Sequence, residues 1–335
     1  MKFGVPILSF AFFCTPLALC WQPAPLWSST NSRLFTFKKS VRRDACITFI
    51  RSSLESSSAL KHIDQIVKAV PVQPRAVYFY DFLEDGRSSF SEKNWMMEVE
   101  DKEFSNEEAG RWESFFLKDV GVVRTRKSHP ADGGLGHVVW NSARVLSALL
   151  LNEDSDMKTN FDGKRVLELG AGAGLMGLSI ARKHPEASVD LTDYLPCLVD
   201  NIREVSERES MENIDAWVLD WKNGLIPEWI PPRTCYDVII ATDCIYHHIP
   251  ADFTATVLKF IEHNPNARIL ISSPSNRNGI PLVVDRLQMI EDRQVEVRQL
   301  QMIGYQVIPA VSEDASDIRF KKFVDHSNFT LIDIQ

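Results

Sequence analysis

The sequence lacks the cysteine and histidine spacings that build disulfide frameworks or zinc sites. No Cys-x-x-Cys or Cys/His pattern is present among its 335 residues, and the adjacent pair His247-His248 would point its side chains apart on a strand or helix. We therefore expect no structural metal and no disulfide framework. Three of the six cysteines fall in the first 46 residues, and an odd number remains beyond them: Cys197, Cys235 and Cys244.

The chain lacks an excess of positive charge outside the N-terminal segment, because acidic residues outnumber basic ones there. The net charge is −8, but residues 1–60 carry seven Lys/Arg against two acidic residues, so the rest of the chain carries −13. An acidic body argues against a protein that binds nucleic acid along its phosphates. It is compatible with a basic protein substrate or a small molecule, and 44% hydrophobic residues suffice for a buried core.

The N-terminus has the composition of a targeting leader. Met1-Lys2 and the apolar run Phe3–Cys20 predict a signal peptide over residues 1–20; a membrane anchor is the alternative, which Pro6 and Pro16 disfavour. Residues 21–60 are rich in Ser and Arg/Lys, as in transit peptides. Together they resemble the bipartite leaders that direct proteins to secondary plastids. We expect a plastid protein with no stable membrane insertion of the mature chain; ordinary secretion is the alternative.

A glycine-rich turn is the most specific motif in the remaining chain. Residues 166–175 read VLELGAGAGL, an apolar run that turns through three alternating glycines into a helix-forming stretch. Glycine lacks the Cβ atom that would hold a ligand away from main chain, and it tolerates positive φ. A nucleotide-like ligand is expected here. Its identity stays open, because Gly172 to Gly177 also matches the GxGxxG spacing of dinucleotide-binding folds.

Strand-like and helix-like segments alternate through the C-terminal two thirds of the chain, which predicts a largely parallel sheet with helices on both faces. We expect a first helix at 141–151, whose apolar residues recur at helical spacing. Strands are expected at 165–169, 188–192, 217–219, 236–241 and 268–272, and further helices at 175–183, 195–209, 253–263 and 281–296. Residues 304–309 and 328–334 are expected to form a closing hairpin. Residues 61–132 are expected to form an N-terminal cap region before a catalytic domain at 133–335.

Acidic residues follow three of the expected strands, where parallel sheets bind ligands. Asp193 comes 21 positions after Gly172 and can accept hydrogen bonds from ribose hydroxyls; a helix N-cap is the alternative. Asp220 can accept from an adenine amine, beside an indole wall at Trp221 that could equally be core. Asp243 ends an apolar strand, three residues before Tyr246, and is the strongest catalytic candidate, with a cap of the next turn as its alternative.

In this order the motifs resemble the seven-strand methyltransferases that use S-adenosylmethionine, and specifically methyltransferase family 16, a protein-lysine methyltransferase branch. Gly134 to Trp140 resembles the lead-in of that branch. The resemblance implies an α/β, Rossmann-like, seven-stranded, mostly parallel sheet with a C-terminal antiparallel hairpin. It also implies that Asp243 and Tyr246 lie at the end of the site that binds the methyl acceptor and act there as catalytic residues. The cofactor contacts expected from the resemblance and from position after the strands are Trp140, Glu168, Gly170, Ala171, Gly172, Gly174, Asp193, Asp220, Trp221 and Thr242.

The leading hypothesis is thus an S-adenosylmethionine-dependent protein-lysine N-methyltransferase that acts, as a monomer, on a lysine-bearing protein and not on nucleic acid. The same chemistry could serve a protein histidine or a small amine such as nicotinamide. An NAD(P)-dependent dehydrogenase is the alternative of another class, although no Tyr-x-x-x-Lys pair is present. A non-catalytic S-adenosylmethionine-binding protein is disfavoured by the Asp243-x-x-Tyr246 motif.

Overall fold

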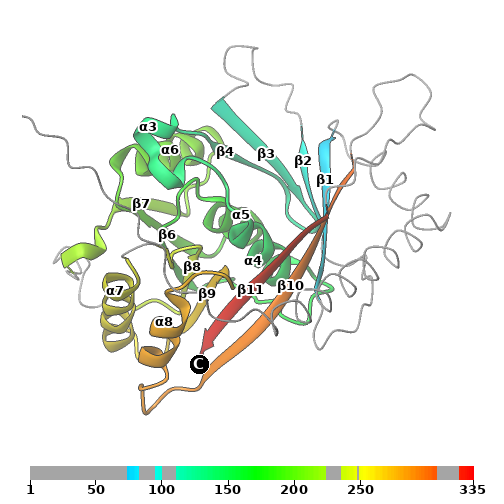
Figure 1. The fold of residues 1–335 in the computed structure, drawn as a ribbon. Helices are drawn as coiled ribbons and strands as arrows, with labels where there is room; N and C mark the ends of the chain where they lie inside the picture. The colour runs from blue at the N-terminus through cyan, green and yellow to red at the C-terminus, as the bar shows by residue number, and fades with distance from the viewer. Residues whose placement is uncertain (1–73, 83–94, 100–110, 224–234, 247–248, 308–323) are drawn as a thin grey trace, which may run out of the picture. The chain divides into compact units, whose positions relative to one another are not determined.

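The computed structural model describes residues 74–82, 95–99, 111–223, 235–246, 249–307 and 324–335 (Figure 1). The expected signal peptide, the transit-like segment and the pair His247-His248 lie outside these residues. The described ranges all belong to one compact unit, Lys61–Gln335. None of their helices is long and apolar enough to cross a membrane.

Seven strands of the C-terminal region form the sheet that positions the site, in the order β7-β6-β5-β8-β9-β11-β10. Neighbours from β7 to β9 pair in parallel, whereas β11 pairs antiparallel with both β9 and β10. This arrangement confirms the predicted mostly parallel sheet with its closing hairpin. The strands are β5 (Arg165–Leu169), β6 (Ser188–Asp193), β7 (Ile214–Val218), β8 (Val238–Thr242), β9 (Arg268–Pro274), β10 (Val295–Val307) and β11 (Val324–Ile334).

Helices cover both faces of this sheet because the buried strands are apolar on both sides. In β8, Val238 and Ile240 join the core beneath one set of helices, and Ile239 and Ala241 join the core beneath the other, as the two-residue period of a strand requires. Figure 1 shows the two sets on opposite sides of the strands. The first set is α4 (Asn141–Leu151), α5 (Leu175–Lys183) and α6 (Pro196–Arg208); the second is α7 (Pro250–His263) and α8 (Ile280–Leu287).

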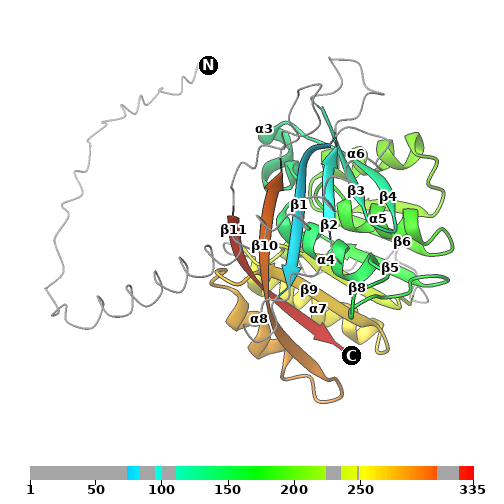
Figure 2. The same cartoon turned by 90° about the vertical axis from the view of Figure 1, so that its right-hand side faces the viewer.

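Four N-terminal strands continue the same sheet beyond β10, so the region expected to be a cap adds to the sheet instead. Figure 2 shows β1 and β2 beside β10. The β3/β4 hairpin packs against the helices: Phe115 and Val123 join the core of α4 and α5, and Arg124 donates to Glu209 at 2.8 Å. None of the described residues of this region lines the cleft discussed below. The strands are β1 (Pro74–Phe82), β2 (Trp95–Val99), β3 (Trp112–Leu117) and β4 (Gly121–Arg126).

Several of the elements expected from the sequence have other bounds in the structure. The helix expected over 281–296 ends at Leu287, and β10 begins at Val295, nine residues earlier in the chain than the hairpin strand expected from 304. Pairing with β11, including Val297 opposite Ile332, overrides the local helical pattern. The third parallel strand spans Ile214–Val218 and not 217–219, because Ile214 pairs with Val189 of β6.

Candidate active site

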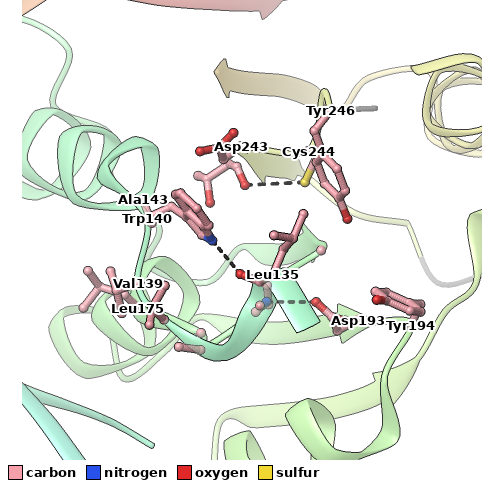
Figure 3. Close-up of a pocket in the computed structure, with 18 of the residues that line it drawn as sticks. Leu135, Val139, Trp140, Ala143, Leu175, Asp193, Tyr194, Asp243, Cys244 and Tyr246 are labelled. Atoms are coloured by element: carbon pink, nitrogen blue, oxygen red, sulfur yellow. Dashed lines mark hydrogen bonds between the residues drawn. The ribbon is translucent and has the colours of Figure 1, made fainter. Parts of the chain in front are cut away.

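The cleft lies at the carboxyl edge of the sheet, where the strand order reverses between β5 and β8. This reversal is the position at which open α/β sheets bind ligands. The cleft encloses about 890 Å³, a volume that includes open solvent at its mouth. Figure 3 shows the labelled side chains converging on it from separate elements. It is lined by Leu135, Gly136, Val138, Val139, Trp140, Ala143, Gly170, Ala171, Gly172, Ala173, Gly174, Leu175, Asp193, Tyr194, Trp221, Thr242, Asp243, Cys244, Tyr246 and Arg277.

The glycine turn after β5 forms the floor of the cleft. Gly170, Gly172 and Gly174 all have positive φ, at 65°, 55° and 79°, a region that side chains with a Cβ rarely adopt. A Cβ atom at Gly170 would lie 2.8 Å from Cys244 Sγ and 2.9 Å from Trp221 Cη2. The sequence therefore needs glycine here both for the turn and for the close approach of two side chains.

The segment before α4 closes one wall of the cleft against this turn. It contains the short helix η2 (Gly134–His137), and a Cβ atom at Gly172 would lie 3.4 Å from the carbonyl oxygen of Gly136. Trp140, at the start of α4, lines the cleft while 41% exposed, and its Nε1 donates to the carbonyl of Leu135 at 2.7 Å. The segment from Gly134 to Trp140 thus supplies an indole wall of the cleft, held in place by a hydrogen bond to the backbone.

Asp193, at the end of β6, is buried in the opposite part of the cleft. Its Oδ2 accepts from the Gly172 N–H at 3.0 Å and its Oδ1 from the Leu195 N–H at 3.2 Å. Burial raises the pKa of Asp193, and the backbone N–H groups that it accepts from oppose that rise. The carboxylate therefore ties the glycine turn to β6. It also lines the cleft beside Tyr194, whose half-exposed ring gives a second aromatic wall (Figure 3).

Glu168 and Asp220 do not line the cleft. Glu168 is 1% exposed and lies behind the glycine turn, where its Oε2 accepts from the Gly177 N–H at 2.8 Å. Burial raises the pKa of Glu168 to about 8. Asp220 is exposed and accepts from the Lys222 N–H at 3.0 Å, which is a local turn contact. Both side chains thus accept hydrogen bonds from backbone N–H groups, Glu168 from the first turn of α5 and Asp220 from the turn after β7.

Trp221 lines the cleft from the loop after β7 and packs on Phe253 of α7, with ring centroids 5.1 Å apart. Its indole Nε1 is buried and has no hydrogen-bond partner in the described part of the chain. A buried indole N–H normally finds an acceptor. Both the glycine floor without Cβ atoms and this unpaired donor fit a bound nucleoside, so the residues present suit S-adenosylmethionine as a ligand.

Asp243 follows β8 directly and reaches the other end of the cleft. Its backbone is left-handed, with φ 56°, a conformation that Asp tolerates better than most residues. Its N–H donates to the carbonyl of Ser272 at 2.8 Å, which anchors the turn to β9. The carboxylate is 8% exposed, and burial raises its pKa against the opposing hydrogen bonds and charge of Arg277.

Tyr246 and Thr242 flank this carboxylate, and both line the cleft. Burial raises the pKa of the Tyr246 phenol further above its ordinary value, so its hydroxyl keeps its proton at neutral pH. Cys244, between them in sequence, packs against the glycine floor, where its Sγ donates to the carbonyl of Leu169 at 3.1 Å. Burial raises the pKa of its thiol well above the ordinary value, which makes it a packing residue and not a nucleophile.

The structure brings most of the predicted site residues into one cleft: Trp140, Gly170, Ala171, Gly172, Gly174, Asp193, Trp221, Thr242, Asp243 and Tyr246. Ten other lining residues were not predicted as site residues, among them Leu135, Tyr194 and Arg277. Tyr194 could have been found, because it follows Asp193 at a strand end. Arg277 could not, because it lies 34 positions from Asp243 in a turn without a motif.

A seven-strand sheet with a glycine turn after its first parallel strand and a cleft at the switch point defines the class I methyltransferase fold. A family model described as "Lysine methyltransferase" matches residues 125–279, which hold every residue of the cleft lining. Over residues 125–279 the chain is therefore similar to the lysine methyltransferases that this family model describes.

Three relatives show the same similarity over limited lengths. The calmodulin-lysine N-methyltransferase of Arabidopsis thaliana is 28% identical over 146 residues, covering 42% of this chain and 46% of that protein. Protein N-lysine methyltransferase METTL21A of Danio rerio is 34% identical over 133 residues, 39% of this chain and 56% of that protein. EEF1A lysine methyltransferase 3 of Xenopus tropicalis is 29% identical, covering 45% and 63%. The chain thus spans about half the length of the relatives it matches.

Proposed function

We propose that this protein is an S-adenosylmethionine-dependent protein-lysine N-methyltransferase. The observation that carries the proposal is the cleft itself, which joins a glycine-rich backbone floor to Asp243 and Tyr246 at its other end. The names of the relatives above support protein lysine as the acceptor. A dehydrogenase is not favoured, because the family and these relatives are methyltransferases.

The residues of the cleft would perform two tasks. The floor from Gly170 to Gly172, with Asp193 and the indole of Trp221, would hold the nucleoside. When bound, S-adenosylmethionine would supply a sulfonium methyl group for attack by a nitrogen lone pair in line with the C–S bond, and S-adenosylhomocysteine would be the leaving group. Trp140 would form a wall beside the nucleoside, and Tyr246 would narrow the space around the acceptor amine and exclude water. Holding two reactants in line supplies much of the rate acceleration.

Asp243 would orient the amine. A lysine ammonium has no lone pair, so one proton must leave before transfer, and an aromatic-lined site favours the neutral amine by penalising the charged form. The Asp243 carboxylate can accept a hydrogen bond from the amine N–H and aim its lone pair at the methyl group. The phenol of Tyr246, which keeps its proton, can donate or accept at the same nitrogen.

The acidic charge of the chain outside its N-terminal segment favours a basic protein as the substrate. One pair of relatives is named for both protein N-terminal and lysine methylation, so a protein α-amine is the second acceptor to test. Histidine and small amines stay as alternatives of the same chemistry, and action as a monomer stays a prediction.

The test is incubation of the purified chain with tritiated S-adenosylmethionine and fractionated cell lysate, followed by mass spectrometry of the labelled protein. Methyl groups on lysine Nζ support the proposal; label only on histidine, an α-amine or a small molecule refutes the lysine assignment. Asp243→Asn is the matched control, because Asn keeps the side-chain shape and tolerates the left-handed backbone. Loss of label in this variant with retained binding of S-adenosylhomocysteine would place Asp243 at the acceptor.

A further inference from the structure

Arg277 lies at the acceptor end of the cleft, although no sequence motif assigns it a role. It sits in the turn between β9 and α8, where its N–H donates to the Pro274 carbonyl at 3.1 Å and its carbonyl accepts from the Ile280 N–H at 3.2 Å. Two guanidinium nitrogens converge on a single oxygen of Asp243: Nη2 lies 2.7 Å and Nε 3.2 Å from Oδ1. The backbone turn therefore fixes a charged contact inside the cleft.

We propose that Arg277 is a positioning residue for the methyl acceptor, holding the Asp243 carboxylate ionised by one oxygen and leaving the other for the incoming amine. The inference rests on the proposed function and deepens it. Oδ2 of Asp243 has no hydrogen bond from any described residue, whereas Oδ1 takes both contacts from the guanidinium. Two N–H groups of one planar guanidinium converge on Oδ1, a directional contact that the point charge of a lysine does not reproduce.

The guanidinium of Arg277 also determines the electrostatic environment of a methyl acceptor in the cleft. Arg277 is the one cationic side chain among the described residues that line the cleft. It stabilises the buried Asp243 carboxylate and, as a fixed positive charge, disfavours a second cation beside it. An acceptor would thus bind as the neutral amine, which is the form that can react.

The other titratable groups around Asp243 do not supply this effect. Asp193, Tyr194, Cys244 and Tyr246 line the same cleft from the ends of β6 and β8, and burial raises the pKa of each of them. None of these four carries a positive charge in any protonation state. The pH dependence of Asp243 and of the acceptor should therefore respond to Arg277 more than to its neighbours.

The first experiment measures Asp243 directly and needs no substrate. Protein labelled with ¹³C at aspartate Cγ is saturated with S-adenosylhomocysteine and titrated by NMR, with Asp243→Asn to assign the signal. In Arg277→Met we expect the Asp243 midpoint to rise by about one pH unit or more. It should stay near the wild-type value in Arg277→Lys, which keeps the charge, and in the control Arg286→Met, an exposed residue of α8 outside the cleft.

The second experiment uses the lysate protein that the unmodified enzyme labels with tritiated S-adenosylmethionine. Without the fixed positive charge, the pKa of the bound lysine amine should rise by about one unit, so Arg277→Met should lose about tenfold in kcat at pH 7 and recover at higher pH. Arg277→Lys should keep the wild-type pH profile with a lower kcat, because it retains the charge but not the fork. Unchanged melting temperature and S-adenosylhomocysteine affinity show that the variants are folded.

An unshifted Asp243 midpoint in Arg277→Met, or an unshifted pH profile in an active variant, overturns the inference while leaving the methyltransferase itself intact. Absence of labelled lysine in the wild-type reaction overturns the proposed function instead. The two failures are therefore distinguishable.

Discussion

Gly170→Ala tests the close packing of the cleft floor. The substitution forces a residue with a Cβ into φ 65°, which costs about 1–2 kcal/mol of unfolding free energy. The new atom would also meet Cys244 Sγ at 2.8 Å and Trp221 Cη2 at 2.9 Å, and such overpacking costs about 1–3 kcal/mol more. The expected total is about 2–5 kcal/mol.

The matched control is Gly163→Ala. Gly163 has φ 68°, but no atom lies within 4 Å of a Cβ placed there, so this variant should lose only the backbone cost of about 1–2 kcal/mol. The difference between the two variants isolates the contact with Cys244 and Trp221. Urea denaturation measures both free energies of unfolding, provided that the transitions are two-state.

Ligand binding separates the two variants further. Because Trp221 must move to admit the Gly170→Ala methyl group, we expect this variant to bind S-adenosylhomocysteine at least about tenfold more weakly, equivalent to about 1.4 kcal/mol. Gly163→Ala, outside the cleft, should bind as the unmodified protein does. Equal stability losses and equal calorimetric affinities for the two variants would refute the packing of Cys244 and Trp221 against the floor.

Three further predictions concern the cofactor end, the buried acid and the leader. Asp193→Asn should weaken S-adenosylhomocysteine binding by about 1.5–3 kcal/mol, the loss expected for hydrogen bonds to a charged group; unchanged calorimetric affinity would show that Asp193 only ties Gly172 to β6. Burial raises the pKa of Glu168 to about 8 from 4.5, so the folded state holds this proton more tightly than the unfolded state. The contribution of Glu168 to the free energy of unfolding therefore falls as pH rises from 4.5 to 8. Glu168→Gln should therefore gain stability relative to wild type between pH 5 and 8 in denaturation curves, and a parallel pH dependence of the two proteins would contradict this sign. A fluorescent fusion of residues 1–60 should reach a plastid, whereas its secretion would reject the proposed leader.

The parallel sheet could be predicted because its signals are local. Apolar strands such as Val238–Thr242 are followed by polar residues, and Gly170 to Gly174 mark one specific turn. Parallel pairing places the strand ends at one edge, so most of the cleft followed from strand positions alone. The family resemblance supplied the number of strands, whereas the closing hairpin was predicted from segments 304–309 and 328–334.

The features that could not be predicted depend on contacts between residues that are far apart in the sequence. The start of β10 is fixed by pairing with β11, and residues 288–294 gave no local signal against a helix. Glu168 faces the first turn of α5 instead of the cleft because side chains alternate along β5, and a one-residue difference in register decides the face. Arg277 reaches Asp243 only because β8 and β9 are neighbours in the sheet.

The most direct test of the account is a crystal structure of this protein with S-adenosylhomocysteine. The account predicts the nucleoside against Gly170 and Gly172 between the walls formed by Tyr194, Trp221 and Trp140, with its sulfur directed toward Asp243 and Tyr246. A nucleoside bound elsewhere, or one whose sulfur points away from Asp243, would contradict it.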